Sequence, residues 1–234
     1  MIELTDLEMN TCFQVKIGGS LGTAFLRGSG TKTYFVTAAH VIGSLKSGDI
    51  IQLHFQKGWK DIEVETAAKN SDGYDVAVFT TKGPKSMPIN FPNELPALFI
   101  GSELKFLGYP HGLTNSYPSQ TGFSTPFVRT AFFSGLYEEN GHEYLVLDGF
   151  NNPGYSGGPI YGLSKSGKPV LVGVVSGYRI EHVSHSGVFQ LDATGNEMRL
   201  NDIYIKPNSG MVLATALGKF SDFLAQITDF NISS

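Results

Sequence analysis

The distribution of apolar residues along the chain has the short period of β-strands over most of its length. In the first third, six segments are rich in β-branched and aromatic residues and are separated by turns of Gly, Ser, Lys and Asn. These segments are 11–17, 22–27, 33–38, 50–56, 61–66 and 75–80. The pattern predicts a first lobe built as a six-stranded meander.

A proline-rich stretch interrupts this pattern. Residues 82–96 contain four of the eleven prolines and have neither helical nor strand periodicity, which predicts a linker between two lobes. The strand pattern then returns in 97–107, 127–138, 143–148, 169–176, 187–191 and 211–215. We therefore expect two lobes, at residues 1–92 and 93–234.

The C-terminus has a different period. Its apolar residues recur at spacings of 3, 4 and 3, as on one face of a helix; they are Leu217, Phe220, Leu224 and Ile227. Together the segments predict an all-β protein of two antiparallel six-stranded β-barrels with a C-terminal α-helix. Closing each lobe into a barrel leaves no long edge strand open, and binding sites often lie between lobes.

Composition and charge exclude several classes of protein. Hydrophobic residues make up 41% and charged residues 16%, which excludes a disordered chain. The formal charge of −4, without a long Lys/Arg run, predicts no nucleic-acid partner. The longest apolar runs, such as 171–175, are shorter than the roughly 20 residues that cross a bilayer, so no membrane partner is expected.

The single cysteine and the N-terminus bear on the compartment. Cys12 has no second cysteine with which to form an internal disulfide. The first ten residues have neither the basic nor the apolar region of a signal peptide. We therefore expect a cytoplasmic protein.

Three segments contain the residues of a nucleophilic catalyst: TAAHV with His40, DVAVF with Asp75, and NPGYSGGP with Ser156. Amide hydrolysis at neutral pH needs a nucleophile stronger than a free hydroxyl, and a neighbouring imidazole provides it by taking the proton during attack. A carboxylate then fixes the tautomer of that imidazole. This chemistry requires no metal and no organic cofactor, and we expect none.

The glycines around Ser156 suit the same reaction. They allow the backbone to turn tightly and to direct N–H groups at the oxygen that becomes negative in the tetrahedral intermediate. The expected donors are the N–H groups of Gly154 and Ser156.

With these motifs the sequence resembles the chymotrypsin-like serine proteases, especially the single-chain bacterial branch that includes the high-temperature-requirement proteases. The resemblance extends over nearly the whole chain, through GTAFL (22–26), TAAHV (37–41), DVAV (75–78), GYPHG (108–112), GYSGGP (154–159) and VLVGVVSG (170–177). It implies a double β-barrel with His40 and Asp75 on the first barrel, Ser156 on the second, and the substrate cleft between them.

The resemblance also suggests a substrate pocket. The residue six positions before the nucleophile is Phe150, which is expected at the base of the S1 pocket. The opposite wall is expected from Ser176, Gly177 and Tyr178. An apolar base cannot compensate a buried guanidinium, so we predict that basic P1 residues are disfavoured and uncharged ones preferred, with an acidic preference as the weaker option. Asp148 would reach the base only if the loop were two residues longer.

One departure concerns activation. Digestive members of the family have a carboxylate just before the nucleophile, which pairs with a newly cut N-terminus. Here that position is Tyr155, so activation by cleavage is not expected.

Three other interpretations of these residues are less favoured. A G-x-S-x-G segment also describes the nucleophile elbow of α/β-hydrolases, which needs a helix after the serine and then an acid followed by a histidine. Here the serine is followed by a segment rich in Pro, Gly and Ser, and no Asp lies between Ser156 and the last histidine, His185. Asp72 could compete with Asp75, although its SDGY context is typical of a turn. His182 and His185 have an H-x-x-H spacing without an obvious third metal ligand, which favours a loop or pocket-wall role.

The sequence therefore predicts a serine endopeptidase that acts on a polypeptide substrate. A catalytically silent protein-binding module on the same fold, or one that an activating protein partner must switch on, is the main alternative. An esterase on this fold would differ only in its pocket.

Overall fold

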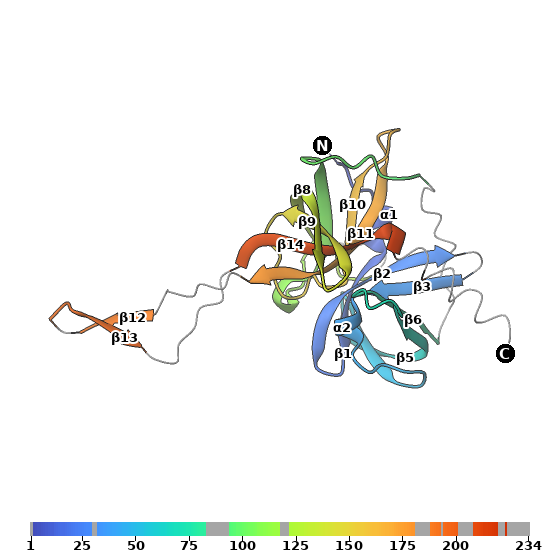
Figure 1. The fold of residues 1–234 in the computed structure, drawn as a ribbon. Coiled ribbons are helices and arrows are strands. Elements are labelled where there is room, and N and C mark those ends of the chain that lie inside the picture. Colours follow the sequence, from blue (N-terminus) through green and yellow to red (C-terminus); the bar gives the residue numbers. More distant parts are fainter. Residues whose placement is uncertain are drawn as a thin grey trace.

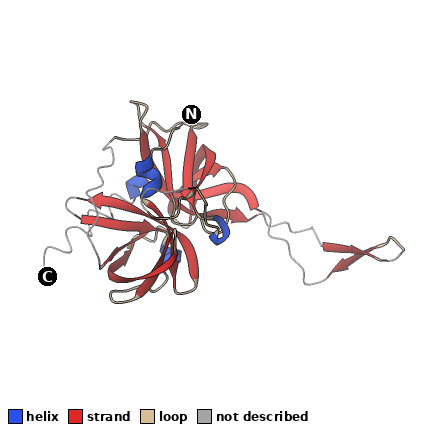
Figure 2. Cartoon of the chain, turned by 180° about the vertical axis from the view of Figure 1, so that it is seen from behind, coloured by secondary structure: helices blue, strands red, loops and turns tan. Residues whose placement is uncertain are grey.

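The structure, a computed structural model, describes residues 2–29, 32–82, 94–117, 122–180, 188–192, 194–200, 208–219 and 223. Strands make up most of these residues (Figure 2). The labelled helical segments are α1 (Asp6–Asn10), α2 (Ala39–Ile42) and the 3-10 turn η1 (Pro110–Gly112), and residues 217–219 and 223 are also helical. The strands are β1 (Cys12–Ile17), β2 (Ser20–Ser29), β3 (Lys32–Thr37), β4 (Ile50–Phe55), β5 (Gly58–Lys69), β6 (Ala77–Thr81), β7 (Glu103–Gly108), β8 (Phe127–Glu139), β9 (His142–Asp148), β10 (Pro159–Leu163), β11 (Pro169–Ile180), β12 (Val188–Leu191), β13 (Glu197–Leu200) and β14 (Asn208–Ala216).

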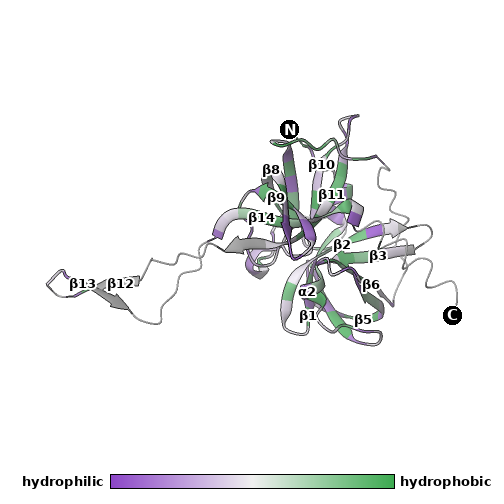
Figure 3. Ribbon diagram, in the orientation of Figure 1, coloured by the Kyte–Doolittle hydropathy of each residue, from purple (hydrophilic) through white to green (hydrophobic). Residues whose placement is uncertain are grey.

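The first six strands close into one antiparallel barrel (Figure 1). Their order is β1-β2-β3-β6-β5-β4, and β1 closes the barrel by pairing with β4, Val15 opposite Leu53. Figure 3 colours the strands by hydropathy. In β1, apolar and polar residues alternate from Phe13 to Ile17, and of these residues only Lys16 is exposed. The buried core includes Ala24 and Leu26 of β2 and the aromatic side chain of Phe79 of β6.

The second barrel also has six antiparallel strands, in the order β10-β11-β14-β9-β8-β7. It closes where β10 pairs with β7, Ile160 opposite Phe106. Its core contains both of these side chains and that of Tyr155, which precedes the expected nucleophile. The prediction of two six-stranded antiparallel barrels is therefore confirmed.

Two strand assignments in the second lobe were wrong. The segment 187–191 was expected in the barrel, but β12 pairs with β13 in a separate two-stranded sheet, and β10 takes the barrel position instead. The strand expected at 97–107 begins only at Glu103, because Gly101 has φ of +87° and the N–H of Ser102 donates to the carbonyl of Phe99 in a turn.

The N-terminal segment and the described residues of the C-terminal helix cover the junction between the barrels. A shared core there combines Phe25 and Val78 of the first barrel with Leu107 and Val174 of the second. Ile2 is buried, and Leu4 and Met9 pack on this core from the N-terminal side. From the C-terminal side, Leu217 and Phe223 pack on it.

The expected C-terminal helix is confirmed at residues 217–219 and 223, which are helical. The remaining residues of its proposed apolar face, Phe220, Leu224 and Ile227, lie outside the described residues. So does most of the proposed linker, including the boundary between residues 92 and 93.

Candidate active site

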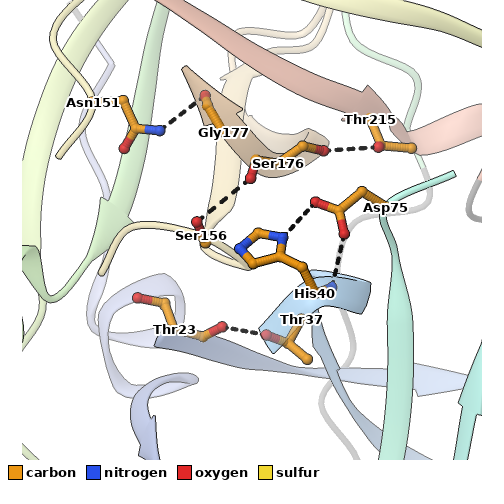
Figure 4. Close-up of polar contacts among 9 residues, drawn as sticks. All are labelled: Thr23, Thr37, His40, Asp75, Asn151, Ser156, Ser176, Gly177 and Thr215. Carbon is orange, nitrogen blue, oxygen red and sulfur yellow. Dashed lines mark hydrogen bonds and ion pairs between the residues drawn. The ribbon is translucent and has the colours of Figure 1, made fainter. Parts of the chain in front are cut away.

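His40 lies on α2, the short helix that follows β3. The buried side chains of Val41 and Ile42 anchor this helix to the first barrel, and Gly43 ends it with a φ of +52° that favours glycine. The imidazole itself is 53% exposed. Its ring is directed toward Ser156 (Figure 4).

The pairing of β3 with β6 brings Asp75 to His40. Thr37 lies opposite Ala77 in this pair, His40 follows Thr37 by three residues, and Asp75 precedes Ala77 by two. One carboxylate oxygen of Asp75 lies 2.8 Å from His40 Nδ1, and the other accepts the His40 backbone N–H at 2.9 Å. Because the carboxylate only accepts, Nδ1 carries the hydrogen and the Nε2 lone pair is free.

This contact changes the acid–base behaviour of the ring. The hydrogen bond that the ring donates to Asp75 raises the pKa of His40 above its ordinary value of 6.5. Partial burial lowers this pKa, and the negative charge of Asp75 raises it further. The protonated ring is therefore stabilised, which is what a general base needs after it has accepted a proton.

Asp72 has no comparable contact. Among the residues described, its carboxylate meets only the hydroxyl of Ser71, at 3.4 Å. Its backbone N–H donates to the side-chain oxygen of Asn70 at 2.8 Å, as in a turn. The structure thus brings Asp75, and not Asp72, to His40.

Ser156 comes from the second barrel, on the loop between β9 and β10. Its hydroxyl donates a long hydrogen bond, 3.4 Å, to the backbone carbonyl of Ser176 (Figure 4). Within the described part of the chain, no hydrogen bond joins Ser156 Oγ to His40. The serine and the imidazole face each other without being engaged.

The backbone before Ser156 presents two N–H groups. The carbonyl before Gly154 accepts the His111 N–H at 2.6 Å, and the carbonyl before Ser156 accepts the Gly158 N–H at 2.8 Å. Since C=O and N–H point in opposite directions across a trans peptide, these bonds turn the N–H groups of Gly154 and Ser156 to the other side. Neither N–H donates a hydrogen bond within the described residues.

Two glycines of this loop permit no side chain. Gly154 has φ of +105°, and a Cβ there would overlap the carbonyl oxygen of Tyr109. Gly157 has φ of +83°, and a Cβ there would overlap the carbonyl oxygen of Thr23 and the hydroxyl of Thr37. The glycines therefore allow the loop to approach both barrels closely.

Tyr155 anchors the same loop. Its ring is buried in the second barrel, 5.0 Å from the Phe106 ring in an edge-to-face arrangement. Burial raises the pKa of its hydroxyl, and a hydrogen bond and the positive charge of Arg129 offset part of that rise. The position that holds a carboxylate in digestive enzymes is thus occupied by a neutral core residue.

The expected pocket residues lie in different environments. Phe150 is 59% exposed, whereas the next residue, Asn151, is 1% exposed and donates from Nδ2 to the Gly177 carbonyl at 2.9 Å. Phe150 lies beyond the end of β9, and its place at the base of the S1 pocket stays a prediction. Ser176 is buried, and its hydroxyl bonds to that of Thr215 at 3.0 Å.

Three other expectations fall partly or wholly outside the described residues. Tyr178 pairs with Val212 through the backbone of β11, but its side chain is not described. His182 and His185 lie wholly outside.

Among the residues that are described, no group of three or more His, Cys, Asp or Glu could hold a metal ion, and no helix is long and apolar enough to cross a membrane.

Sequence reasoning missed the residues that hold the serine loop from outside. The Thr23 hydroxyl donates to the Gly154 carbonyl, and the Tyr109 N–H donates to the Thr23 hydroxyl. His111 has a φ of +52°, which is rare for a residue with a side chain. The segments GTAFL and GYPHG contain all three, so a signal was present without an assigned role. The Thr23 hydroxyl bonds to backbone groups, the Gly154 carbonyl and the Tyr109 N–H, which every residue type offers at those positions.

A double β-barrel with a His–Asp pair on one barrel and a serine facing it from the other defines the trypsin-fold class. The family model described as "Trypsin-like peptidase domain" matches residues 22–174. The match covers more than half of the chain, and the protein belongs to this family. A search of curated proteins found no match.

Solved structures agree with the fold. The apo MamO protease domain from Magnetospirillum magneticum superposes with a TM-score of 0.55 at 14% identity, covering 93% of this chain and 97% of that one. Rv3671c from M. tuberculosis H37Rv, as an inactive form with a Ser343Ala mutation, superposes with a TM-score of 0.58 at 18% identity, covering 97% and 89%. At these identities the similarity concerns the fold alone.

Proposed function

We propose that the protein is a serine endopeptidase in which His40, Asp75 and Ser156 form the catalytic triad. The main support is the bidentate contact of Asp75 with His40, which leaves the Nε2 lone pair facing Ser156. The two unengaged N–H groups of Gly154 and Ser156 support the same proposal. A polypeptide is the proposed substrate.

The reaction proceeds by acyl transfer. His40 Nε2 takes the Ser156 proton as Oγ attacks the scissile carbonyl carbon, and the carbonyl oxygen becomes an oxyanion bound by the N–H groups of Gly154 and Ser156. His40 then gives the proton to the leaving amine, and the C–N bond breaks. Water attacks the resulting ester with His40 again as base, which releases the acid and restores Ser156.

One rotation precedes the attack. The Ser156 hydroxyl donates to Ser176 at 3.4 Å, longer than a typical O–H···O bond of about 2.7–2.8 Å. Turning about the Cα–Cβ bond moves the hydroxyl from this weak acceptor to His40. Catalytic hydrogen bonds often tighten only when substrate is bound.

That same contact favours a second candidate, a binding module on this fold that is silent or needs a partner. In a silent module the Ser156 hydroxyl would stay bonded to the Ser176 carbonyl permanently. In a partner-activated module it would stay there until a partner displaced it. The two candidates differ in the nucleophilicity of one hydroxyl, which is directly measurable.

Labelling with a fluorophosphonate distinguishes them. We expect a single adduct on Ser156 in the unmodified protein, located by mass spectrometry, and none in Ser156→Ala or His40→Ala. Asp72→Asn is the matched control and should label at the unmodified rate. An adduct on any other residue contradicts the assignment of the nucleophile, and no adduct supports the binding module.

The P1 preference remains part of this proposal. The buried polar side chains beside β11 in the described part of this region, those of Asn151, Ser176 and Thr215, are all neutral, so none of them can pair with the charge of a basic P1 side chain. We propose that uncharged P1 residues are preferred.

A further inference from the structure

Thr23 on β2 belongs to the first barrel, yet it makes three hydrogen bonds to the second. Its N–H donates to the Ser156 carbonyl at 2.9 Å, and its hydroxyl donates to the Gly154 carbonyl at 2.7 Å. The hydroxyl also accepts the Tyr109 N–H at 3.3 Å. The residue is 0% exposed, and Figure 4 shows it beneath the serine loop.

These bonds complete a series along the loop. The carbonyls of residues 153 and 155 are held by the N–H groups of His111 and Gly158. Thr23 holds the two remaining carbonyls, those of Gly154 and Ser156. Four consecutive peptide planes therefore have fixed orientations, and the two N–H groups proposed to bind the oxyanion belong to the first and third of them.

Among the described residues, the Gly154 carbonyl and the Tyr109 N–H have no hydrogen-bond partner other than the Thr23 hydroxyl. A Cβ on Gly108 would lie 2.9 Å from Thr23 Oγ1, so the site admits no larger neighbour. A valine at position 23 would fill the same volume but would leave the Gly154 carbonyl and the Tyr109 N–H buried without a partner. Buried polar groups left in this way are costly, and rotation of the Gly154 peptide would relieve the cost.

We propose that Thr23 is a positioning residue: by fixing the second and fourth of these peptide planes, it keeps the adjoining first and third planes, which contain the Gly154 and Ser156 N–H groups, in the orientation that binds the oxyanion. This inference rests on the proposed function, because it assigns a task to the proposed oxyanion-binding groups. It also makes the hole dependent on the first barrel, since the second barrel alone lacks this hydroxyl.

The test compares Thr23→Val, which removes the hydroxyl at constant shape, with Thr23→Ser, which restores it. Thr11→Val is the matched control, because the hydrogen bonds that the buried Thr11 hydroxyl donates in the described part of the chain go to the carbonyls of Leu7 and Glu8 in the N-terminal helix. Rates of fluorophosphonate labelling are measured as a function of pH. Amide signals of Gly154 and Ser156 are recorded by NMR on the 15N-labelled proteins.

We expect Thr23→Val to label about 10-fold to 100-fold more slowly, less than the roughly 10²–10³-fold cost of deleting an oxyanion donor outright. The pH midpoint should stay unchanged, because the Asp75–His40 pair is untouched. Thr23→Ser and Thr11→Val should label within about threefold of the unmodified protein. The Gly154 and Ser156 amide signals should move or broaden in Thr23→Val alone.

Labelling of Thr23→Val at the unmodified rate, with unchanged amide signals, overturns the inference. If the unmodified protein does not label, the proposed function fails, and the amide signals still decide whether Thr23 orients the loop. If Thr23→Val does not fold, Thr23→Ala, which removes the same hydroxyl without adding an apolar branch, is measured in its place.

Discussion

Replacing Asp75 with Asn tests how His40 is oriented. The carboxylate accepts two hydrogen bonds, from the backbone N–H and from Nδ1 of the same histidine. An amide has only one oxygen, and the backbone N–H of His40 can only donate. The oxygen of Asn would therefore stay bonded to this N–H. The NH₂ group would then face Nδ1, and only an unprotonated Nδ1 could accept from it.

The consequence is an imidazole with its hydrogen on Nε2, the wrong tautomer for a base. In the best-studied triad this substitution costs about 10⁴-fold in kcat, and we expect a similar loss here. The pKa of His40 should also fall, because both causes that raise it come from Asp75, and only the lowering effect of burial remains. Since labelling requires the unprotonated ring, we expect its low-pH limb above 6.5 in the unmodified protein and below 6.5 in Asp75→Asn.

The assay is the pH dependence of fluorophosphonate labelling between pH 5 and 9. Asp72→Asn, whose carboxylate meets only Ser71 among the residues described, is the matched control and should retain both rate and midpoint. Equal losses in the two variants, or an Asp75→Asn profile whose midpoint stays above 6.5, would refute the role given to Asp75.

Further outcomes follow from other contacts. Gly154→Ala should abolish labelling, because its Cβ would overlap the Tyr109 carbonyl oxygen; retention of full activity would contradict the loop geometry. His142→Ala removes the 2.7 Å contact with the Asp72 carbonyl, worth about 1 kcal/mol, and should lower the thermal midpoint by about 2–4 °C in a scanning measurement. Cys12 is buried with its pKa raised by burial, so Ellman's reagent should react only after unfolding. Profiling of cleaved peptides should show uncharged P1 residues, and a dominant Arg or Lys would contradict the pocket proposal.

The strands of the barrels were predictable where one face is buried. In β1, apolar and polar residue types alternate from Phe13 to Ile17, a pattern that periodicity detects although Gln14 is buried as well. The strand β10 was missed because it is short, begins with a proline and is buried on both faces, so no alternation marks it. The segment of β12 was assigned to the barrel because period alone says nothing about which strand is the partner.

The chemistry of the site was more predictable than its support. His40, Asp75 and Ser156 each occur in a distinctive local segment, and their roles depend on residue type. The bond between Thr23 and Gly154 joins residues 131 positions apart and uses a backbone acceptor, so no local pattern encodes it.

The cross-barrel bonds also bear on the alternative of a partner-activated module. A partner could act by ordering the serine loop or by moving Ser156 toward His40. The loop is already held at four consecutive carbonyls by groups of this chain, two of them held by Thr23. Ordering the loop is therefore not a task that remains for a partner. What remains is the displacement of the Ser156 hydroxyl from the Ser176 carbonyl, a rotation about one bond against a hydrogen bond of 3.4 Å. A substrate whose own N–H binds the Ser176 carbonyl would accomplish the same displacement, and for this reason we favour an enzyme that its substrate alone activates.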